Sequence, residues 1–323
     1  RENEIVHCIA CAQGCFDHLF KLKQVECLCN PRAGHEKECR LQSSDTPAKV
    51  MVVGGGPAGM SAALAAAECG HDVVIYEKEN RLGGQLYLAS APPGRAEFSE
   101  LAKDLATQVA VQKIRVVLNT AVDEKVLEDE MPGAVILATG AKPITPPIPG
   151  VELAHVVQSW DVLLNRVATG RRAVVIGGGA VGVETALFLG EKGTLSGEAV
   201  KFLLVNKAET PEDLYELATQ GTKDVVLIEM VKKSGKDIGL TTRWGMLQDM
   251  SRVGVKTNVS TKALEITPTG VTVDMDGQTE TIPADTVVLA VGSESYNPLQ
   301  EVMEYKDIPY QVVGDAQAVA LAF

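Results

Sequence analysis

The chain has 323 residues, of which 46% are apolar, enough for about two domains with packed cores. Its formal net charge is −12 and no basic run stands out, which argues against nucleic acid and anionic membranes as partners. No stretch approaches the roughly 20 apolar residues of a membrane-spanning helix, and no secretory leader is visible, so we expect a cytoplasmic protein.

Residues 1–46 are irregular and rich in cysteine. Clustered thiols in a large acidic chain are typical of a metal site, whereas disulfide scaffolds are typical of small secreted chains. The pattern C-x2-C-x3-C-x11-C gives four candidate metal ligands: Cys8, Cys11, Cys15 and Cys27. Three close ligands and one further on favour an iron–sulfur cluster over zinc, which usually pairs two C-x2-C knuckles. The spacing leaves Cys29 and Cys39 as alternatives to Cys27.

A strand–helix–strand unit follows the cysteine segment. Its expected elements are a buried strand at Lys49–Val53, a helix at Ser61–Cys69 and a strand at Asp72–Tyr76. Between the first strand and the helix lies a G-x-G-x-x-G fingerprint: Gly54, Gly56 and Gly59. In dinucleotide-binding folds these glycines permit the tight turn, the close approach of the pyrophosphate, and the packing of helix on strand. Glu77 ends the second strand, where an acidic residue is expected to bind the adenosine ribose hydroxyls.

A second unit of the same kind begins at Arg172, after a proline-rich crossover at residues 142–150. Its expected elements are a strand at Ala173–Ile176, a helix at Val181–Leu189 and a strand at Val225–Glu229. An insertion at residues 191–223 separates this helix from the last strand. Within the insertion, Thr210 followed by Pro211 indicates a helix start, while residues 201–205 fit a helix or a strand.

The second unit carries its own fingerprint: Gly177, Gly179 and Gly182, with Glu184 just inside the helix. Glu229 ends the second strand, where a carboxylate accepts from the ribose 2′-hydroxyl and repels a 2′-phosphate, so NADH is favoured over NADPH. Lys232 and Lys233 follow closely and weaken that preference. Two dinucleotide sites in tandem suggest a bound flavin and a nicotinamide that reduces it. No C-x2-C or C-x4-C pair accompanies either fingerprint, which argues against a disulfide reductase of the thioredoxin reductase type.

The runs Cys8–Asp17 and Cys27–Pro31 resemble the cluster motif of the 2,4-dienoyl-CoA reductase, enoate reductase and trimethylamine dehydrogenase group. These are the iron–sulfur flavoenzymes of the Old Yellow Enzyme superfamily. The family's fourth ligand is the cysteine of C-x2-N-P, which is Cys27 here, so the resemblance implies a [4Fe-4S] cluster. The match continues through Ile238–Trp244 and ends with Val313–Asp315. The family's Gly-Asp pair places a carboxylate on the flavin ribityl chain, so Asp315 implies FAD rather than ADP. The residues that the resemblance adds to the FAD site are Gly84, Gln85, Thr139, Gly140, Gly314 and Asp315.

The resemblance implies an α/β fold with two Rossmann-like nucleotide-binding domains of the pyridine nucleotide-disulfide reductase type, preceded by the cysteine-rich iron–sulfur segment. The expected parts are the iron–sulfur segment at 1–46, the FAD domain at 47–155 and 284–323, with its second part truncated, and the NAD(P)H domain at 156–283. Family members also carry an N-terminal TIM barrel with FMN and the substrate site. We expect this barrel as the missing N-terminal domain of a longer polypeptide or as a separate subunit.

The expected function is therefore hydride transfer from NADH to FAD, followed by single-electron transfer through the cluster to the FMN barrel, which reduces an activated C=C bond. An oligomer is expected. The redox chemistry belongs to the cofactors, so no catalytic acid or base is assigned to this chain. Three alternatives remain: an amine dehydrogenase-type module with ADP in place of FAD, a zinc-stabilised nucleotide-binding module without redox turnover, and an electron-transfer subunit for an unrelated partner.

Overall fold

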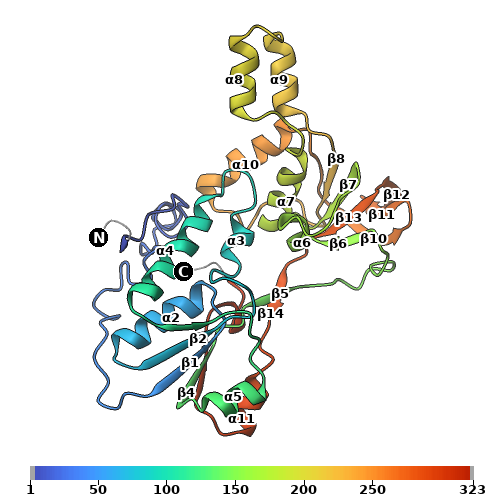
Figure 1. The fold of residues 1–323 in the computed structure, drawn as a ribbon. Coiled ribbons are helices and arrows are strands. Elements are labelled where there is room, and N and C mark those ends of the chain that lie inside the picture. Colours follow the sequence, from blue (N-terminus) through green and yellow to red (C-terminus); the bar gives the residue numbers. More distant parts are fainter. Residues whose placement is uncertain (1–3, 321–323) are drawn as a thin grey trace. The chain divides into compact units, whose positions relative to one another are not determined.

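The computed structural model describes residues 4–320 of the chain, which divides into two compact units (Figure 1). Unit 1 comprises residues 1–90, 95–142 and 293–323, and unit 2 comprises residues 91–94 and 143–292. The end of the segment expected to be truncated, residues 321–323, lies outside the described residues. Two short strands, β5 (Ala141–Pro143) and β14 (Ser293–Ser295), pair where the chain passes between the units.

Unit 1 is built on a five-stranded parallel sheet with the order β15-β4-β1-β2-β3. Its strands are β1 (Lys49–Val53), β2 (Asp72–Tyr76), β3 (Arg115–Val117), β4 (Ala134–Leu137) and β15 (Tyr310–Val312). Its helices are α1 (Phe16–Phe20), α2 (Pro57–Glu68), α3 (Leu86–Ala89), α4 (Glu97–Val111), α5 (Glu124–Glu130) and α11 (Gln300–Tyr305), with a 3-10 turn η2 (Gly314–Ala316).

The sheet of unit 1 lies between two helical layers. Successive side chains of a strand point to opposite faces, so each buried strand contributes to two cores. Val52 and Ile75 pack on the face covered by α2 and α4. Met51 and Val74 pack on the other face, with residues of α5 and α11. This arrangement is that of a Rossmann-like unit.

Unit 2 repeats the parallel sheet, with the order β6-β13-β7-β8-β9, and adds an antiparallel sheet β10-β11-β12. The parallel strands are β6 (Val156–Gln158), β7 (Arg172–Ile176), β8 (Asp224–Ile228), β9 (Lys256–Asn258) and β13 (Thr286–Leu289). The antiparallel strands are β10 (Thr261–Thr267), β11 (Gly270–Met275) and β12 (Gln278–Pro283). The helices are α6 (Ser159–Leu163), α7 (Ala180–Gly190), α8 (Gly197–Val205), α9 (Pro211–Thr219) and α10 (Leu240–Arg252).

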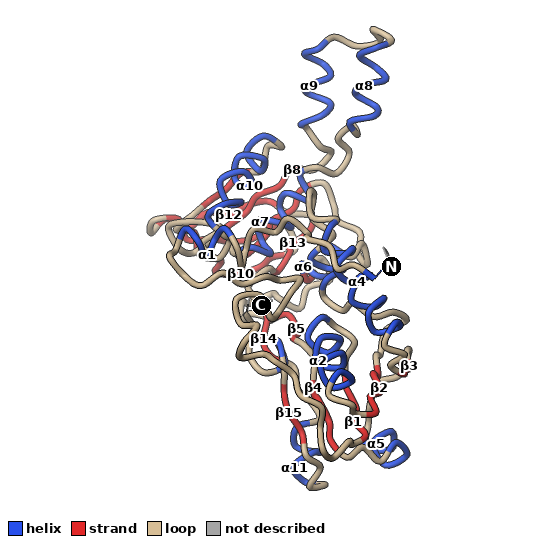
Figure 2. Tube along the Cα trace, turned by 90° about the vertical axis from the view of Figure 1, so that its left-hand side faces the viewer, coloured by secondary structure: helices blue, strands red, loops and turns tan. Residues whose placement is uncertain are grey.

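The parallel sheet of unit 2 has helices on one face and the antiparallel sheet on the other. Val175 of β7 packs with residues of α7 and α10. Its neighbour Val174 packs with Val271 and Val273 of β11. The two helices of the insertion form a hairpin that extends from this unit, drawn as two blue segments in Figure 2.

Both expected strand–helix–strand units are confirmed, as β1-α2-β2 and β7-α7-β8. Helix α2 begins at Pro57 rather than at the expected Ser61, because proline is tolerated in the first turn and the fingerprint glycines are part of the helix start. The helix start at Thr210 is also confirmed, since its side chain accepts a hydrogen bond from the Asp213 amide at 3.1 Å. Residues 201–205, which the sequence left undecided, lie in α8. Within residues 4–320, no helix combines the length and apolarity needed to cross a membrane.

The cysteine segment packs on the helices of unit 1. Ile9 is buried in the core on the α2 and α4 face. The backbone amide of His7 donates to Asp104 Oδ2 of α4 at 2.8 Å, and its ring Nδ1 lies 3.0 Å from the same oxygen. Arg32 pairs with Glu68 at the end of α2, with Nη1 3.2 Å from Oε1. Contacts near the start of the segment and at Arg32 in its second half therefore hold it against the helices of the first nucleotide-binding unit.

Candidate functional site

Five thiols gather in one part of the cysteine segment. Burial raises the pKa of the Cys11 thiol, and the neighbouring thiols of Cys15, Cys27 and Cys8 add to this effect. Burial likewise raises the pKa of Cys29 to about 11, with smaller contributions from Cys27, Cys11 and Cys8. The four predicted ligands therefore lie near one another, and Cys29 lies with them. Cys39 and Cys69 are instead neighbours of the Arg32 guanidinium.

A close backbone approach brings the two halves of the thiol cluster together. The Glu26 amide donates to the Gly14 carbonyl at 2.7 Å. A Cβ on Gly14 would lie 2.6 Å from the Glu26 oxygen and 3.1 Å from the Cys27 nitrogen, so only glycine fits there. The chain beside Cys15 is thereby held against the chain before Cys27.

Backbone amides point at the sulfur atoms, which suits thiolate ligands. The Ala10 amide lies 3.4 Å from Cys8 Sγ, and backbone hydrogen bonds from Gln13 and Ile9 stabilise the thiolates of Cys11 and Cys29. Hydrogen bonds to sulfur are one of the features by which proteins tune iron–sulfur clusters. Among the described residues, no three His, Cys, Asp or Glu side chains are arranged to hold a single metal ion. Several thiols with backbone amides directed at their sulfur atoms are the donors that an iron–sulfur cluster needs, so the residues present fit the expected cluster.

The first glycine fingerprint forms the turn between β1 and α2. Gly54 has φ +108°, a conformation that residues with a Cβ rarely adopt, and a Cβ on Gly59 would collide with the Gly54 carbonyl oxygen. A Cβ on Gly56 would meet nothing within 4 Å. Gly56, the N-cap residue of α2, has no side chain to cap the helix, and among residues 4–320 no other side chain accepts from the first turn. The helix end beside Gly56 is thus open to an anion such as a pyrophosphate.

Glu77 provides the carboxylate of the first candidate nucleotide site. Its side chain is buried, and its Oε2 accepts from the Gly55 amide at 2.7 Å while its Oε1 accepts from the Glu79 amide at 2.8 Å. Each carboxylate oxygen keeps a second lone pair for a ribose hydroxyl. The carboxylate therefore lies directly against the glycine turn, as a dinucleotide site requires.

The remaining predicted FAD residues converge on the same helix end. A Cβ on Gly84 would lie 3.0 Å from the Gly56 Cα, and a Cβ on Gly314 would lie 2.6 Å from the Ala58 Cβ. The Gln85 side-chain amide donates to Asp315 Oδ2 at 3.3 Å. Thr139 donates to the Tyr296 carbonyl at 2.5 Å, and the next residue, Gly140, would place a Cβ 3.3 Å from the Gln85 amide. Segments far apart in the sequence thus surround the N-terminus of α2.

The second fingerprint repeats this geometry between β7 and α7. Gly177 has φ +106°, and a Cβ on Gly182 would collide with the Gly177 carbonyl oxygen. Glu229 Oε2 accepts from the Gly178 amide at 2.6 Å, and its Oε1 accepts from the Val231 amide at 2.9 Å. Glu184 lies half-buried within α7. Each unit therefore places a glutamate against the glycine turn of its own fingerprint.

One residue of the second site was not foreseen from the sequence. Asp237 lies in the loop after β8, and its Oδ2 accepts from the Ala180 amide at 3.0 Å, at the first turn of α7. A Cβ on Gly179 would lie 3.1 Å from the same oxygen, whereas the equivalent Gly56 faces open space. The loop is held there by the Gly235 amide, which donates to the Gly178 carbonyl at 2.6 Å. The only hint in the sequence was that Asp237 directly precedes the Ile238–Trp244 run.

Cationic side chains gather beside the end of β8. Lys233 and Arg243 line a cleft together with Ser234, whose buried hydroxyl has no hydrogen-bond partner among the described residues. These groups follow Glu229 in the chain. The preference for NADH over NADPH that the sequence indicates at Glu229 stays a prediction.

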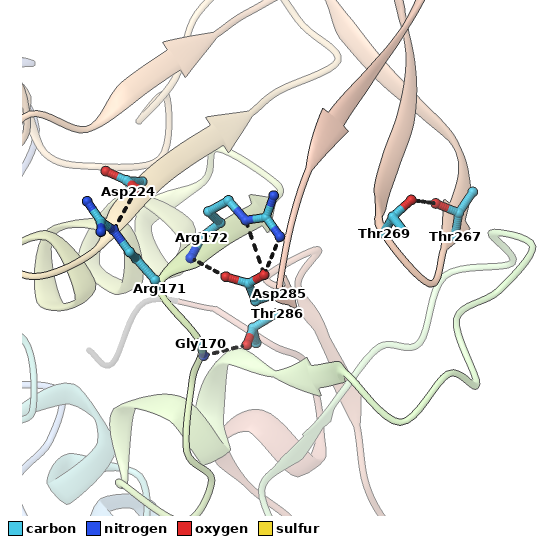
Figure 3. Close-up of polar contacts among 8 residues, drawn as sticks. All are labelled: Gly170, Arg171, Arg172, Asp224, Thr267, Thr269, Asp285 and Thr286. Atoms are coloured by element: carbon cyan, nitrogen blue, oxygen red, sulfur yellow. Dashed lines mark hydrogen bonds and ion pairs between the residues drawn. The ribbon is translucent and has the colours of Figure 1, made fainter.

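A group of polar contacts, here called the Arg172–Asp285 latch, joins β7 to β13 at the amino ends of the strands in unit 2. Arg172 at the start of β7 pairs with Asp285 before β13, through its Nε at 3.1 Å and its backbone amide at 2.9 Å (Figure 3). The Gly170 amide donates to Thr286 Oγ1 at 2.8 Å. Nucleotides bind at the carboxyl ends of parallel strands, and this latch lies at their amino ends. It is therefore structural, and it fixes β7 against β13.

Comparisons with known proteins agree with this geometry. The sequence profile of the family described as "Pyridine nucleotide-disulphide oxidoreductase" matches residues 48–311. The "Metal reductase" of Desulforamulus reducens is 45% identical over 317 residues, which are 97% of this chain and 48% of that protein. The "NADH oxidase" of Thermoanaerobacter brockii is 36% identical over 327 residues, 99% of this chain and 46% of that protein. The solved structure of a 2-naphthoyl-CoA reductase complex superimposes with a TM-score of 0.86 at 28% identity, over 100% of this chain and 45% of that chain.

These matches confirm the predicted fold class, and they support a flavin- and NAD(P)H-dependent oxidoreductase module. The chain spans about half the length of the curated relatives it matches. It belongs to the pyridine nucleotide-disulphide oxidoreductase family, and within it to the 2,4-dienoyl-CoA reductase group that its cysteine motif resembles.

Proposed function

We propose that this chain is the NADH-oxidising module of an iron–sulfur flavoenzyme. FAD bound to unit 1 takes a hydride from NADH bound to unit 2, and its electrons leave singly through a [4Fe-4S] cluster held by the cysteine segment. The observation that carries the proposal is the repeated site, in which Glu77 and Glu229 each accept from a glycine amide of a G-x-G-x-x-G turn. One such turn is weak evidence, but two in one chain supply a site for each of two dinucleotides.

The roles of the residues in unit 1 follow from their positions. The open helix end beside Gly56 would take the FAD pyrophosphate, and Glu77 would bind the adenosine ribose. Gln85 and Asp315, which already share a hydrogen bond, would hold the flavin's ribityl chain. In unit 2, Gly179 and Glu229 would take the corresponding parts of NADH, with NADPH the less favoured donor.

Four thiolates, those of Cys8, Cys11, Cys15 and Cys27, are the proposed cluster ligands. The backbone amide near Cys8 and the one near Cys11 would stabilise the anionic sulfurs. The cysteine segment packs on α2 and α4 of unit 1, the unit proposed to bind FAD. The position of the thiols on this unit is what an electron path out of the flavin needs.

The proposed electron acceptor is an FMN-binding TIM barrel, either as a further domain of the same polypeptide or as a separate subunit. Reduction of an activated C=C bond, as in an enoate or an enoyl-CoA, is the proposed reaction of that barrel. Two observations support this class: the cysteine motif, and the likeness to a protein solved as a 2-naphthoyl-CoA reductase complex. The chain is proposed to work in the cytoplasm.

An anaerobic titration with NADH tests the proposal. The chain is purified, its iron and flavin are measured, and NADH is added while flavin absorbance and the electron paramagnetic resonance of the reduced cluster are followed. We expect bleaching of the flavin together with the appearance of the cluster signal, and a weaker response to NADPH. If neither signal changes although flavin and iron are bound, NADH is not the donor and the amine dehydrogenase direction is the better assignment. Zinc in place of iron would reject the redox module altogether.

A further inference from the structure

The α8–α9 hairpin, residues 197–219, exposes an unusual amount of apolar surface. No residue of α8 is buried, and α9 buries only Leu214 and Thr219. Phe202, Val205 and Tyr215 are 66%, 71% and 64% exposed. Leu204 and Leu217 add further exposed apolar surface. Several large apolar side chains exposed on one short hairpin are typical of an interaction site in a soluble protein.

The hairpin is nevertheless held firmly at its base. The Leu195 amide donates to the Leu217 carbonyl at 2.9 Å, and the Thr222 amide donates to the Lys192 carbonyl at 2.7 Å. Ser196 and Thr210 cap the two helices with their side chains. Each helix has only nine residues, shorter than the roughly 12–15 that an isolated helix needs in water, so packing must supply the rest of its stability. Figure 1 shows both helices extending away from the sheet of unit 2.

The two helices carry opposite charges. Helix α8 and its end bear two bases, Lys201 and Lys207, against one acid, Glu198. Helix α9 and the residue before its cap bear only acids: Glu209, Glu212, Asp213 and Glu216. Within the described part of the chain, none of these side chains has an ion-pair partner. A partner with the complementary arrangement of charges would form ion pairs with both helices.

A second copy of this chain presents that arrangement. In a two-fold pair the same surface meets itself, so the basic α8 of one copy can lie against the acidic α9 of the other, and the reverse contact forms at the same time. We infer that two copies of the chain associate through their α8–α9 hairpins in this way. The paired hairpins bury Phe202, Val205 and Tyr215, and the charges flank the buried surface. This pairing is independent of the proposed redox function.

Measurement of the molar mass in solution tests the pairing directly. The full chain is examined by light scattering and sedimentation over a range of concentrations. We expect a dimer that the double variant Phe202→Ser and Val205→Ser weakens by at least about tenfold, because truncating central apolar residues of an interface raises its dissociation constant. Both residues are exposed and make no core contact, so far-UV circular dichroism of the variant should match that of the parent chain. A monomeric parent chain, or a dimer that this variant leaves unchanged, would overturn the inference.

Charge reversal gives a sharper test. Variant A carries Lys201→Glu and Lys207→Glu, so all its hairpin charges are acidic. Variant B carries Glu212→Lys and Glu216→Lys, so its α9 with Glu209 has two acids and two bases and no net charge. We expect each variant alone to associate more weakly than the parent, and a mixture of A and B to form mixed dimers, because the parental α8 of B meets the parental α9 of A. High salt should weaken the parent dimer because exposed charges are screened. Failure of the mixed pair to form would contradict the opposed arrangement of α8 and α9.

Discussion

Asp237 Oδ2 accepts a hydrogen bond from the Ala180 amide at 3.0 Å, so a carboxylate occupies the N-terminus of α7. Among residues 4–320, no carboxylate occupies the N-terminus of α2, the equivalent helix of unit 1, and Gly56 there faces open space. Helix N-termini attract anions through free amides and the helix dipole. In unit 2 the anion already present belongs to the protein. A pyrophosphate proposed to bind there would meet a negative charge, which the flavin site does not present.

Replacing this carboxylate tests its effect on nucleotide binding. We expect Asp237→Asn to bind NADH about three- to tenfold more tightly, because one like charge beside the pyrophosphate is removed while the amide oxygen still accepts from Ala180. Binding is measured by calorimetry on the flavin-loaded chain. Asp224→Asn is the matched control, since it also removes one negative charge, but at the amino end of β8, away from the glycine turn. Unchanged or weaker binding would show that Asp237 supports the site rather than opposing it.

Substitutions at two glycines of the first fingerprint should distinguish an effect on folding from an effect on flavin binding. We expect Gly59→Ala to destabilise the flavin-free chain by about 1–3 kcal/mol, because its Cβ would press on the Gly54 carbonyl oxygen in a packed turn. Gly56→Ala should leave that stability nearly unchanged, since its Cβ meets nothing within 4 Å, yet it should weaken FAD binding by obstructing the helix end. Urea unfolding of the flavin-free chain and FAD titration measure the two effects. Equal FAD affinity in Gly56→Ala and the parent would place the pyrophosphate elsewhere.

Local patterns accounted for much of the site. The glycine turns and the two glutamates at strand ends were predictable, because each depends on residues adjacent to a strand–helix junction. Asp237 was not predictable, because it reaches a helix start 57 residues earlier through the path of an irregular loop. The inserted hairpin was only half predicted. Thr210 followed by Pro211 indicated one helix, but residues 202–205 are a continuous apolar run, which has no periodicity that distinguishes a helix from a strand. Both the Asp237 contact and the helical state of α8 depend on packing between segments that are separate in the sequence.

The fourth cluster ligand can be assigned by paired substitutions. Cys27 and Cys29 both lie near Cys8 and Cys11, so their positions alone do not separate them. From the motif, we expect Cys27→Ser to lose most of its iron and the cluster signal, and Cys29→Ser to retain both. Iron per chain and electron paramagnetic resonance after reduction provide the measurement, with flavin content as the control for folding of unit 1. Loss of iron in Cys29→Ser alone would reverse the assignment.

The Arg172–Asp285 latch predicts a specific acid sensitivity. Hydrogen bonds from Arg172 lower the pKa of Asp285 from 3.8 to about 2, so the folded state favours its ionised form. A carboxyl whose pKa is lower in the folded state contributes stability above its unfolded pKa and loses that contribution as the pH falls through the folded value. We therefore expect Asp285→Asn to be less stable than the parent at neutral pH, and the difference to shrink as the pH falls from about 4 to about 2. Urea unfolding at several pH values measures this difference in stability.

Asp224→Asn, which removes the more exposed pair with Arg171, is the control and should show a smaller difference from the parent (Figure 3). A difference between Asp285→Asn and the parent that stays constant across this range would mean that the latch acts through packing rather than through charge.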